Sequence, residues 1–210
     1  LIRREGGPPW VVIGEIGDNA GVHDEVFLHL VEVDQERKSH QWIGSFPVTY
    51  PDGPRDAESL AWDPVEEQIL ILSKRDQPAR LYSVDLPEDF SPSLGGASIM
   101  AEFLGELGGI PAPTPEFISR HPRWGKWSAQ PTAMDINAEG NRAAVLTYND
   151  LYLYSRAEGQ SWAEAFRGSP RILDIRLVGQ TEAVAFSLEE EAVFIVPEGK
   201  NPTLLRVAMP

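Results

Sequence analysis

Apolar residues recur along the chain in short runs that alternate with polar residues or form continuous stretches of strand length. Turn-forming clusters such as Pro51-Asp52-Gly53 separate these runs. A short helix is predicted at 161–166, with Ser161 as its N-cap and Glu164 placed to complete a capping box. The predicted strands are 10–16, 26–33, 41–48, 59–62, 68–73, 80–84, 98–104, 133–136, 143–148, 151–154, 171–177, 183–186, 192–196 and 203–207. This pattern predicts an all-β chain.

Three segments of the chain repeat one pattern without a gap: 58–74, 132–148 and 182–198. They start 132 − 58 = 74 and 182 − 132 = 50 residues apart. Each segment reads as a strand, a polar turn and a second strand, and a third strand follows. Such a repeat is typical of a β-propeller built from four-stranded antiparallel blades. Residues 63–64 and 137–141 are predicted as hairpin turns only.

The repeat predicts a single propeller domain over residues 1–210, with about four blades wholly or partly represented. The first unit lacks a predicted inner strand and the last lacks an outer strand. Because an open ring leaves sheet edges bare, we expect five or six blades in the complete ring. A segment preceding Leu1 or a second chain would then complete it. Residues 105–131 are rich in glycine, proline and tryptophan and are predicted as a long surface insertion.

Charge and composition exclude several classes of function. The chain carries 18 basic and 32 acidic residues, which gives a net charge of −14. This acidity argues against nucleic acid and against anionic membrane surfaces as partners. No apolar run reaches the ~20 residues of a transmembrane helix. Cysteine is absent, which excludes disulfides and thiolate chemistry. The four histidines are widely scattered, and neither a zinc motif nor a G-x-S-x-G elbow occurs.

Equivalent positions of a propeller repeat form rings around its axis, so acids far apart in the sequence should meet there. The predicted ring residues are Glu58, Thr132 and Glu182 at the first strands, with Glu15, Lys74, Tyr148 and Glu198 at the ends of the second. The adjoining turns contain Asp18, Asn19, Asp52, Asp56 and Gln180. Converging oxygen donors suit Ca²⁺ better than zinc. The predicted calcium ligands are Asp18, Asn19, Glu58, Gln180 and Glu182.

Each of these residues also has a purely structural interpretation. Asp18 and Asn19 belong to a residue class that forms turns without binding any ligand. Lys74 can pair with Glu58 or Glu198 as a structural bridge. Glu58 and Glu182 begin apolar strands that should be buried, where an acid needs a partner. Their role as metal ligands or catalytic acids is therefore favoured.

Three motifs carry a resemblance to a known family. The pieces are 13–19 (IGEIGDN), 50–58 (YPDGPRDAE) and 179–183 (GQTEA). They resemble the GDIGDN, YPDGxxDAEAL and GQxEA motifs of a bacterial exported β-propeller family of largely unassigned function. That family is similar to phytase-like and gluconolactonase-like propellers. The resemblance implies an extracellular or periplasmic location, with lipid anchoring through a segment outside this sequence left open.

The chain also departs from that family's pattern. Glu15 stands where aspartate is usual, Leu146 where arginine is usual, and His23 near another arginine position. An anion-binding role of those arginines therefore does not transfer to this chain.

Two functions remain open at this stage. The first is an exported binding module that holds Ca²⁺ at the channel mouth and contacts a small-molecule or protein ligand. The second is a calcium-dependent hydrolase of an ester, lactone or phosphate, with Glu58 or Glu182 as general base. Binding is favoured, because no second catalytic group such as a well-placed histidine is apparent.

Overall fold

The computed structural model describes residues 1–3, 7–34, 36, 38–86, 97–173 and 180–209, and its strands form four sheets. The first sheet has the order β1 (Trp10–Glu15), β2 (Val26–Asp34), β3 (Ser39–Thr49) and β7 (Ile99–Met100). The second has β4 (Ala57–Asp63), β5 (Gln68–Ser73), β6 (Arg80–Asp85) and β8 (Glu102–Glu106). The third has β9 (Pro131–Ile136), β10 (Arg142–Thr147), β11 (Leu151–Ser155) and β12 (Arg171–Leu173). The fourth has β13 (Thr181–Phe186), β14 (Ala192–Pro197) and β15 (Leu205–Ala208).

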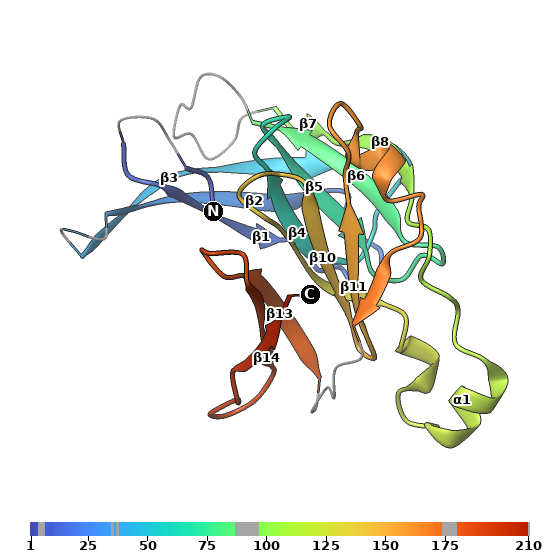
Figure 1. Cartoon of the computed structure of the whole chain (residues 1–210). Helices are drawn as coiled ribbons and strands as arrows, with labels where there is room; N and C mark the ends of the chain where they lie inside the picture. Colours follow the sequence, from blue (N-terminus) through green and yellow to red (C-terminus); the bar gives the residue numbers. More distant parts are fainter. Residues whose placement is uncertain (4–6, 35, 37, 87–96, 174–179, 210) are drawn as a thin grey trace.

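The four sheets are the blades of a β-propeller, as predicted (Figure 1). The inner strands β4, β9 and β13 are neighbours, with β9 between the other two. The repeat offsets hold for both strands of each hairpin. From β4 to β9 and from β5 to β10 the offset is 74 residues, and from β9 to β13 and from β10 to β14 it is 50. The ungapped sequence repeat therefore corresponds to one structural unit used three times.

The first sheet differs from the other three. Ile2 pairs with Trp10 through two backbone hydrogen bonds of 2.8 and 2.9 Å, so Ile2 lies beside the edge of β1. The predicted strand 98–104 is wrong as a single strand. It divides into β7, which runs parallel to β3, and β8, which joins β6. Between them Ala101 is buried and donates its N–H to the carbonyl of Thr49 at 2.9 Å, which ties the first two sheets together.

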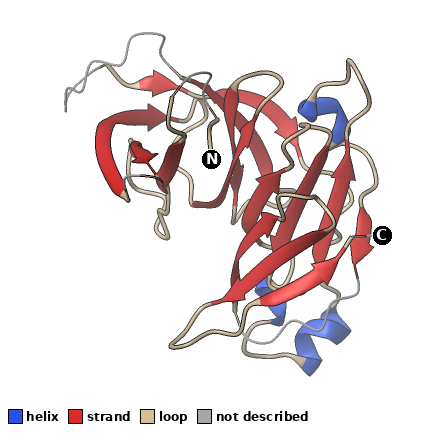
Figure 2. Cartoon of the chain, turned by 60° about the vertical axis from the view of Figure 1, so that its left-hand side comes forward, coloured by secondary structure: helices blue, strands red, loops and turns tan. Residues whose placement is uncertain are grey.

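Helices are few and lie outside the sheets (Figure 2). Helix α2 (Trp162–Ala165) has the predicted capping box between Ser161 and Glu164. The insertion 105–131 begins within β8 and contains two elements that the sequence pattern did not reveal, α1 (Pro115–Arg120) and the 3₁₀ helix η1 (Gly125–Trp127). Helix α1 protrudes from the body of the molecule in Figure 1. Among the described residues no helix combines the length and apolar character that crossing a membrane requires.

Three apolar clusters join successive sheets. The first and second sheets share a cluster that includes Leu28 and Ile71, and the second and third share one that includes Leu72 and Val145. The third and fourth sheets meet through a cluster around Leu146. Each of these side chains is fully buried. Blade-to-blade packing therefore fixes the inner strands and the polar residues at their ends.

Of the predicted strand 171–177, residues 174–177 lie outside the described residues.

Candidate functional site

A β-bulge occurs at the same repeat position in all three inner strands. Glu58 is the residue without a partner in the register of β4 with β5. Thr132 has this place in β9, and Glu182 has it in β13. A bulged residue is displaced from the regular alternation of the strand, and its side chain is re-aimed. The bulges direct Glu58 and Glu182 toward solvent at one end of the channel, which we call the glutamate end.

Lys74 is the cation at the centre of the glutamate end. The ammonium group is 2.6 Å from Glu58 Oε1 and donates to the Tyr148 hydroxyl at 2.9 Å. The side chain of Lys74 is buried, and its hydrogen bonds to Glu58 and Tyr148 raise its pKa even though desolvation opposes this. Lys74 thus joins the second and third sheets. The predicted structural bridge between Lys74 and Glu58 is present.

Two further glutamates share the field of this lysine. Partial burial raises the pKa of Glu182, and the negative charges of Glu198 and Glu58 raise it further, while Lys74 acts in the opposite direction. Glu58, Glu182 and Glu198 carry three negative charges against the single charge of Lys74. The glutamate end therefore keeps an excess of negative charge.

Glu58 and Glu182 were expected to be buried, and this expectation is wrong. The side chain of Glu58 is 31% exposed, and Glu182 is also exposed. Both glutamates lie at the beginning of an inner strand, and the bulge there directs their side chains toward the end of the channel. Thr132 is instead fully buried and donates its hydroxyl to the carbonyl of Thr181 at 2.7 Å. Thr132 and Thr181 therefore fix β9 against β13.

Asp18, Asn19 and Asp56 form a second polar group next to the glutamate end. The Asp18 N–H donates to Asp56 Oδ1 at 2.9 Å, and the backbone N–H of His23, which donates to Asp18 at 2.8 Å, lowers the pKa of that carboxyl. Arg75 contacts Asp56 Oδ2 at 2.6 Å and donates to Asn19. His23 and Arg75 were not predicted as partners of these acids. Arg75 directly follows Lys74, which was the available signal.

The remaining predicted residues take other places. Glu15 hydrogen-bonds to His29 Nε2 at 3.2 Å on the first sheet, away from Lys74. Gln180 is exposed and accepts the N–H of Glu198 through its backbone carbonyl at 2.7 Å. The structure therefore brings together Glu58, Lys74, Tyr148, Glu182 and Glu198, and it sets Asp18, Asn19 and Asp56 beside them as a separate, internally paired group.

The predicted calcium ion needs acids that are not already paired with a cation of the protein. In the described part of the chain, no three side chains from the metal-binding types are already arranged around a common ion position. Asp18 and Asp56 are engaged by His23 and Arg75, and Glu58 is engaged by Lys74. Among the residues that the structure describes, neither Glu182 nor Glu198 forms an ion pair, although the charge of Lys74 acts on Glu182.

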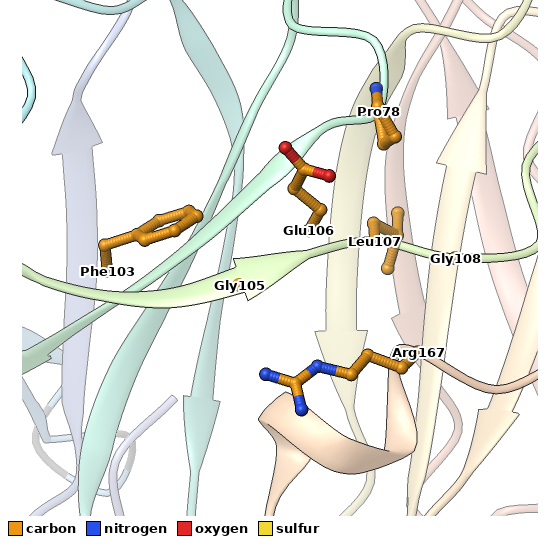
Figure 3. A pocket seen from close by; sticks show the side chains of 7 residues that line it. All are labelled: Pro78, Phe103, Gly105, Glu106, Leu107, Gly108 and Arg167. Atoms are coloured by element: carbon orange, nitrogen blue, oxygen red, sulfur yellow. The ribbon is translucent and has the colours of Figure 1, made fainter.

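A separate hollow of about 480 Å³ lies at the outer strand β8, far from the predicted ring (Figure 3). Glu106, Phe103 and Arg167 line it, and Figure 3 shows the Glu106 carboxylate and the Arg167 guanidinium on opposite sides of β8. Gly105 has a φ of +140°, and a side chain there would meet the guanidinium at 3.4 Å. None of the predicted site residues lines this hollow.

Neither a family model nor a curated protein matches the chain by sequence. Solved structures match by fold. A proposed 6-phosphogluconolactonase from Bacteroides uniformis aligns with a TM-score of 0.52 and 10% identity over 96% of this chain and 64% of that protein. The Pseudomonas aeruginosa periplasmic gluconolactonase PpgL aligns with a TM-score of 0.48 and 11% identity over 100% of this chain and 67% of its own length.

The β-propeller domain of Myceliophteria thermophila Cps50 (Swd1) aligns with a TM-score of 0.46 and 12% identity, over 95% of this chain and 55% of that domain. The chain spans about half the length of solved structures of this kind, with 43% of a Kuenenia stuttgartiensis hydrazine synthase chain as one example. At such identities the likeness concerns the fold. By its four sheets and by its likeness to the Bacteroides structure, the chain is a β-propeller.

Proposed function

We propose that this chain is an exported propeller module that binds a positively charged ligand at the glutamate end, and that Ca²⁺ is the simplest ligand of this kind. The observation that carries the proposal is the convergence of three glutamates from the second and fourth sheets around one lysine, which pairs with Glu58 alone. Carboxylates that converge without enough positive charge repel one another, and a bound cation relieves this repulsion. The extracellular or periplasmic location is proposed from the motif resemblance.

The proposal centres on Glu182 and Glu198 rather than on the turn at Asp18. The Asp18 carboxylate already accepts the backbone N–H of His23, whereas burial raises the pKa of Glu182 and the negative charges of Glu198 and Glu58 raise it further. Carboxylate oxygens are preferred Ca²⁺ ligands, and exposed sites on extracellular modules bind with a Kd on the order of 10⁻⁴–10⁻³ M. Lys74 competes with the ion for Glu58, which keeps the expected affinity at the weak end.

Calorimetric titration with calcium chloride tests this function. We expect Glu182→Gln and Glu198→Gln each to weaken binding by about tenfold or more, equivalent to ~1.4 kcal/mol. Glu158→Gln is the matched control, because it removes the same charge from an exposed residue of the third sheet's loop. The proposal is contradicted if calcium releases no heat and leaves the melting temperature unchanged, or if the control weakens binding equally.

The hydrolase alternative has one observation in its favour. A carboxyl with a raised pKa can serve as a general acid or base, and Glu182 is such a group. Aryl esters, lactones and phosphate monoesters should then be turned over in the presence of calcium, and Glu182→Gln should abolish the turnover. Turnover that survives this substitution would exclude Glu182 as the base while leaving calcium binding to be judged by calorimetry.

A further inference from the structure

The opposite end of the channel has a hollow of its own. The residues at the glutamate end begin the inner strands, whereas this hollow lies where those strands finish. Its lining includes Trp62 from β4, Asp135 from β9 and Phe186 from β13, together with Arg3, Glu67 and Leu188. Four residues of extended strand separate Glu58 from Trp62, so the two ends are about 13 Å apart. We call this second site the Asp135 hollow.

Size and lining indicate a small ligand with an apolar body. The hollow has a volume of about 230 Å³. At the ~30 Å³ that a water molecule occupies in the liquid, this is room for roughly eight heavy atoms. Trp62 and Phe186 are half-buried, so part of each ring stays accessible. Pockets of this composition bind organic molecules, and a few polar groups then set the specificity.

Asp135 is the half-buried carboxylate in the lining of this hollow. Its Oδ2 accepts the backbone N–H of Phe186 at 2.8 Å, which fixes the carboxyl between two inner strands. Among the described residues it has no ion-pair partner. Asp63, at the equivalent end of β4, is instead bound by Arg156 at 2.8 and 2.9 Å. Burial raises the pKa of Asp135, and the hydrogen bonds from the backbone of Phe186 and Ile136 oppose this only in part.

The charges around the hollow favour a cationic ligand. Glu67 adds a second carboxylate, and the whole chain carries a net charge of −14, which attracts cations to any cleft. The face of a tryptophan ring is the strongest aromatic partner for an ammonium group. Arg3 is the cation of the lining, but it is exposed and can keep its guanidinium in water. The side chain of Asn137 is already occupied by Asn141 and Glu190.

We propose that the Asp135 hollow binds a small organic amine, with the ammonium group on the Asp135 carboxylate and the apolar body against Trp62 and Phe186. This site is independent of the calcium proposed for the glutamate end. Among the residues described, Asp135 is the one inner-strand acid that is held between two blades without a cation. The aromatic side chains of the hollow lie beside it.

Calorimetric titration with benzylamine, which has eight heavy atoms, is the direct test. Benzyl alcohol and benzoate are the matched neutral and anionic probes. We expect benzylamine to bind at least tenfold more tightly than either. Asp135→Asn should lose that preference, because asparagine can still accept the Phe186 N–H but carries no charge. Asp85→Asn, at the exposed end of β6, removes the same charge elsewhere and should leave binding unchanged.

Two further variants keep the test decisive. Ala138→Phe fills the hollow from an exposed turn without touching the sheets and should abolish benzylamine binding even if Asp135→Asn folds poorly. Glu182→Gln should leave it unchanged, which separates this site from the calcium site. Tighter binding of benzoate, equal binding of all three probes, binding that Asp135→Asn does not weaken, or no binding of benzylamine would each overturn the proposal.

Discussion

The two ends of the channel treat acidic side chains in opposite ways. At the glutamate end, Glu58 and Glu182 lie at the beginning of inner strands and are partly exposed to solvent. Lys74 is the cation beside them. At the far end Asp63 and Asp135 stand near the last residues of β4 and β9 and are buried or half-buried. An exposed acid tolerates an incomplete partner because water solvates it, whereas a buried acid does not. The comparison sets Asp63, which is fully buried and has a fixed cation, against Asp135, which is half-buried and has no ion-pair partner among the described residues.

Asp63 shows what a buried acid requires. Arg156 binds both of its carboxylate oxygens, donates to the carbonyl of Gly140 at 2.8 Å and lies over the ring of Trp162 at 4.8 Å. The arginine therefore joins the second sheet to the third through a carboxylate that is fully buried. In the next blade the 74-residue offset matches Asp63 with Asn137, and Asp135 lies near the same end of β9, where it accepts the backbone N–H of Phe186.

The largest effect is expected when the buried pair is broken. Arg156→Met leaves the Asp63 carboxylate buried without its cation, which should lower the free energy of unfolding by about 3–5 kcal/mol. Chemical denaturation measures this, with Arg171→Met on the exposed face of β12 as the control. Adding Asp63→Leu to Arg156→Met should recover much of the loss. A loss below about 1 kcal/mol, as for a surface pair, would break the distinction between the two ends.

The fold could be predicted further than the site because repetition is visible in sequence and bulges are not. The offsets of 74 and 50 residues placed both hairpin strands of three blades correctly. The residue types around Glu58 and Glu182 do not indicate that either residue is displaced from the pairing register of its strand. Both were therefore wrongly predicted to be buried. Asp63 was predicted as a turn residue. It does accept the N–H of Val65, but its partner Arg156 is 93 residues away and depends on how the blades pack.

Loss of Lys74 is the second largest expected effect. Lys74→Met removes a buried ammonium with charge-assisted bonds to Glu58 and Tyr148, which should lower the free energy of unfolding by about 1.5–3 kcal/mol. Because folding raises the pKa of Lys74, its contribution is complete below 10.5 and is lost as the pH rises through the folded-state pKa. Denaturation of both proteins across alkaline pH measures this. If their stabilities do not converge, the lysine does not act through its charge.

Asp135→Asn should act in the opposite direction at neutral pH. The folded-state pKa of Asp135 is raised, so its ionised form lowers stability and the variant should be the more stable protein. As the pH falls through the raised pKa, the folded protein takes up the proton first, and the difference should vanish below 3.8. Melting temperatures across this range, without amine in the buffer, are the measurement. A variant less stable than the parent at pH 7 would show that the carboxylate is already compensated.

The smallest effect belongs to Glu182, and its size tests whether exposure is what separates the two ends. The pKa of Glu182 is raised, so Glu182→Gln should also stabilise the protein at neutral pH, and the gain should fade as the pH drops toward 4.5. Because solvent screens this side chain, the gain should stay within about 0.5 kcal/mol. Denaturation in calcium-free buffer, beside Asp135→Asn under the same conditions, gives the comparison. A gain from Glu182→Gln as large as that from Asp135→Asn would mean that the converging glutamates, rather than burial, set the cost of an acid in this propeller.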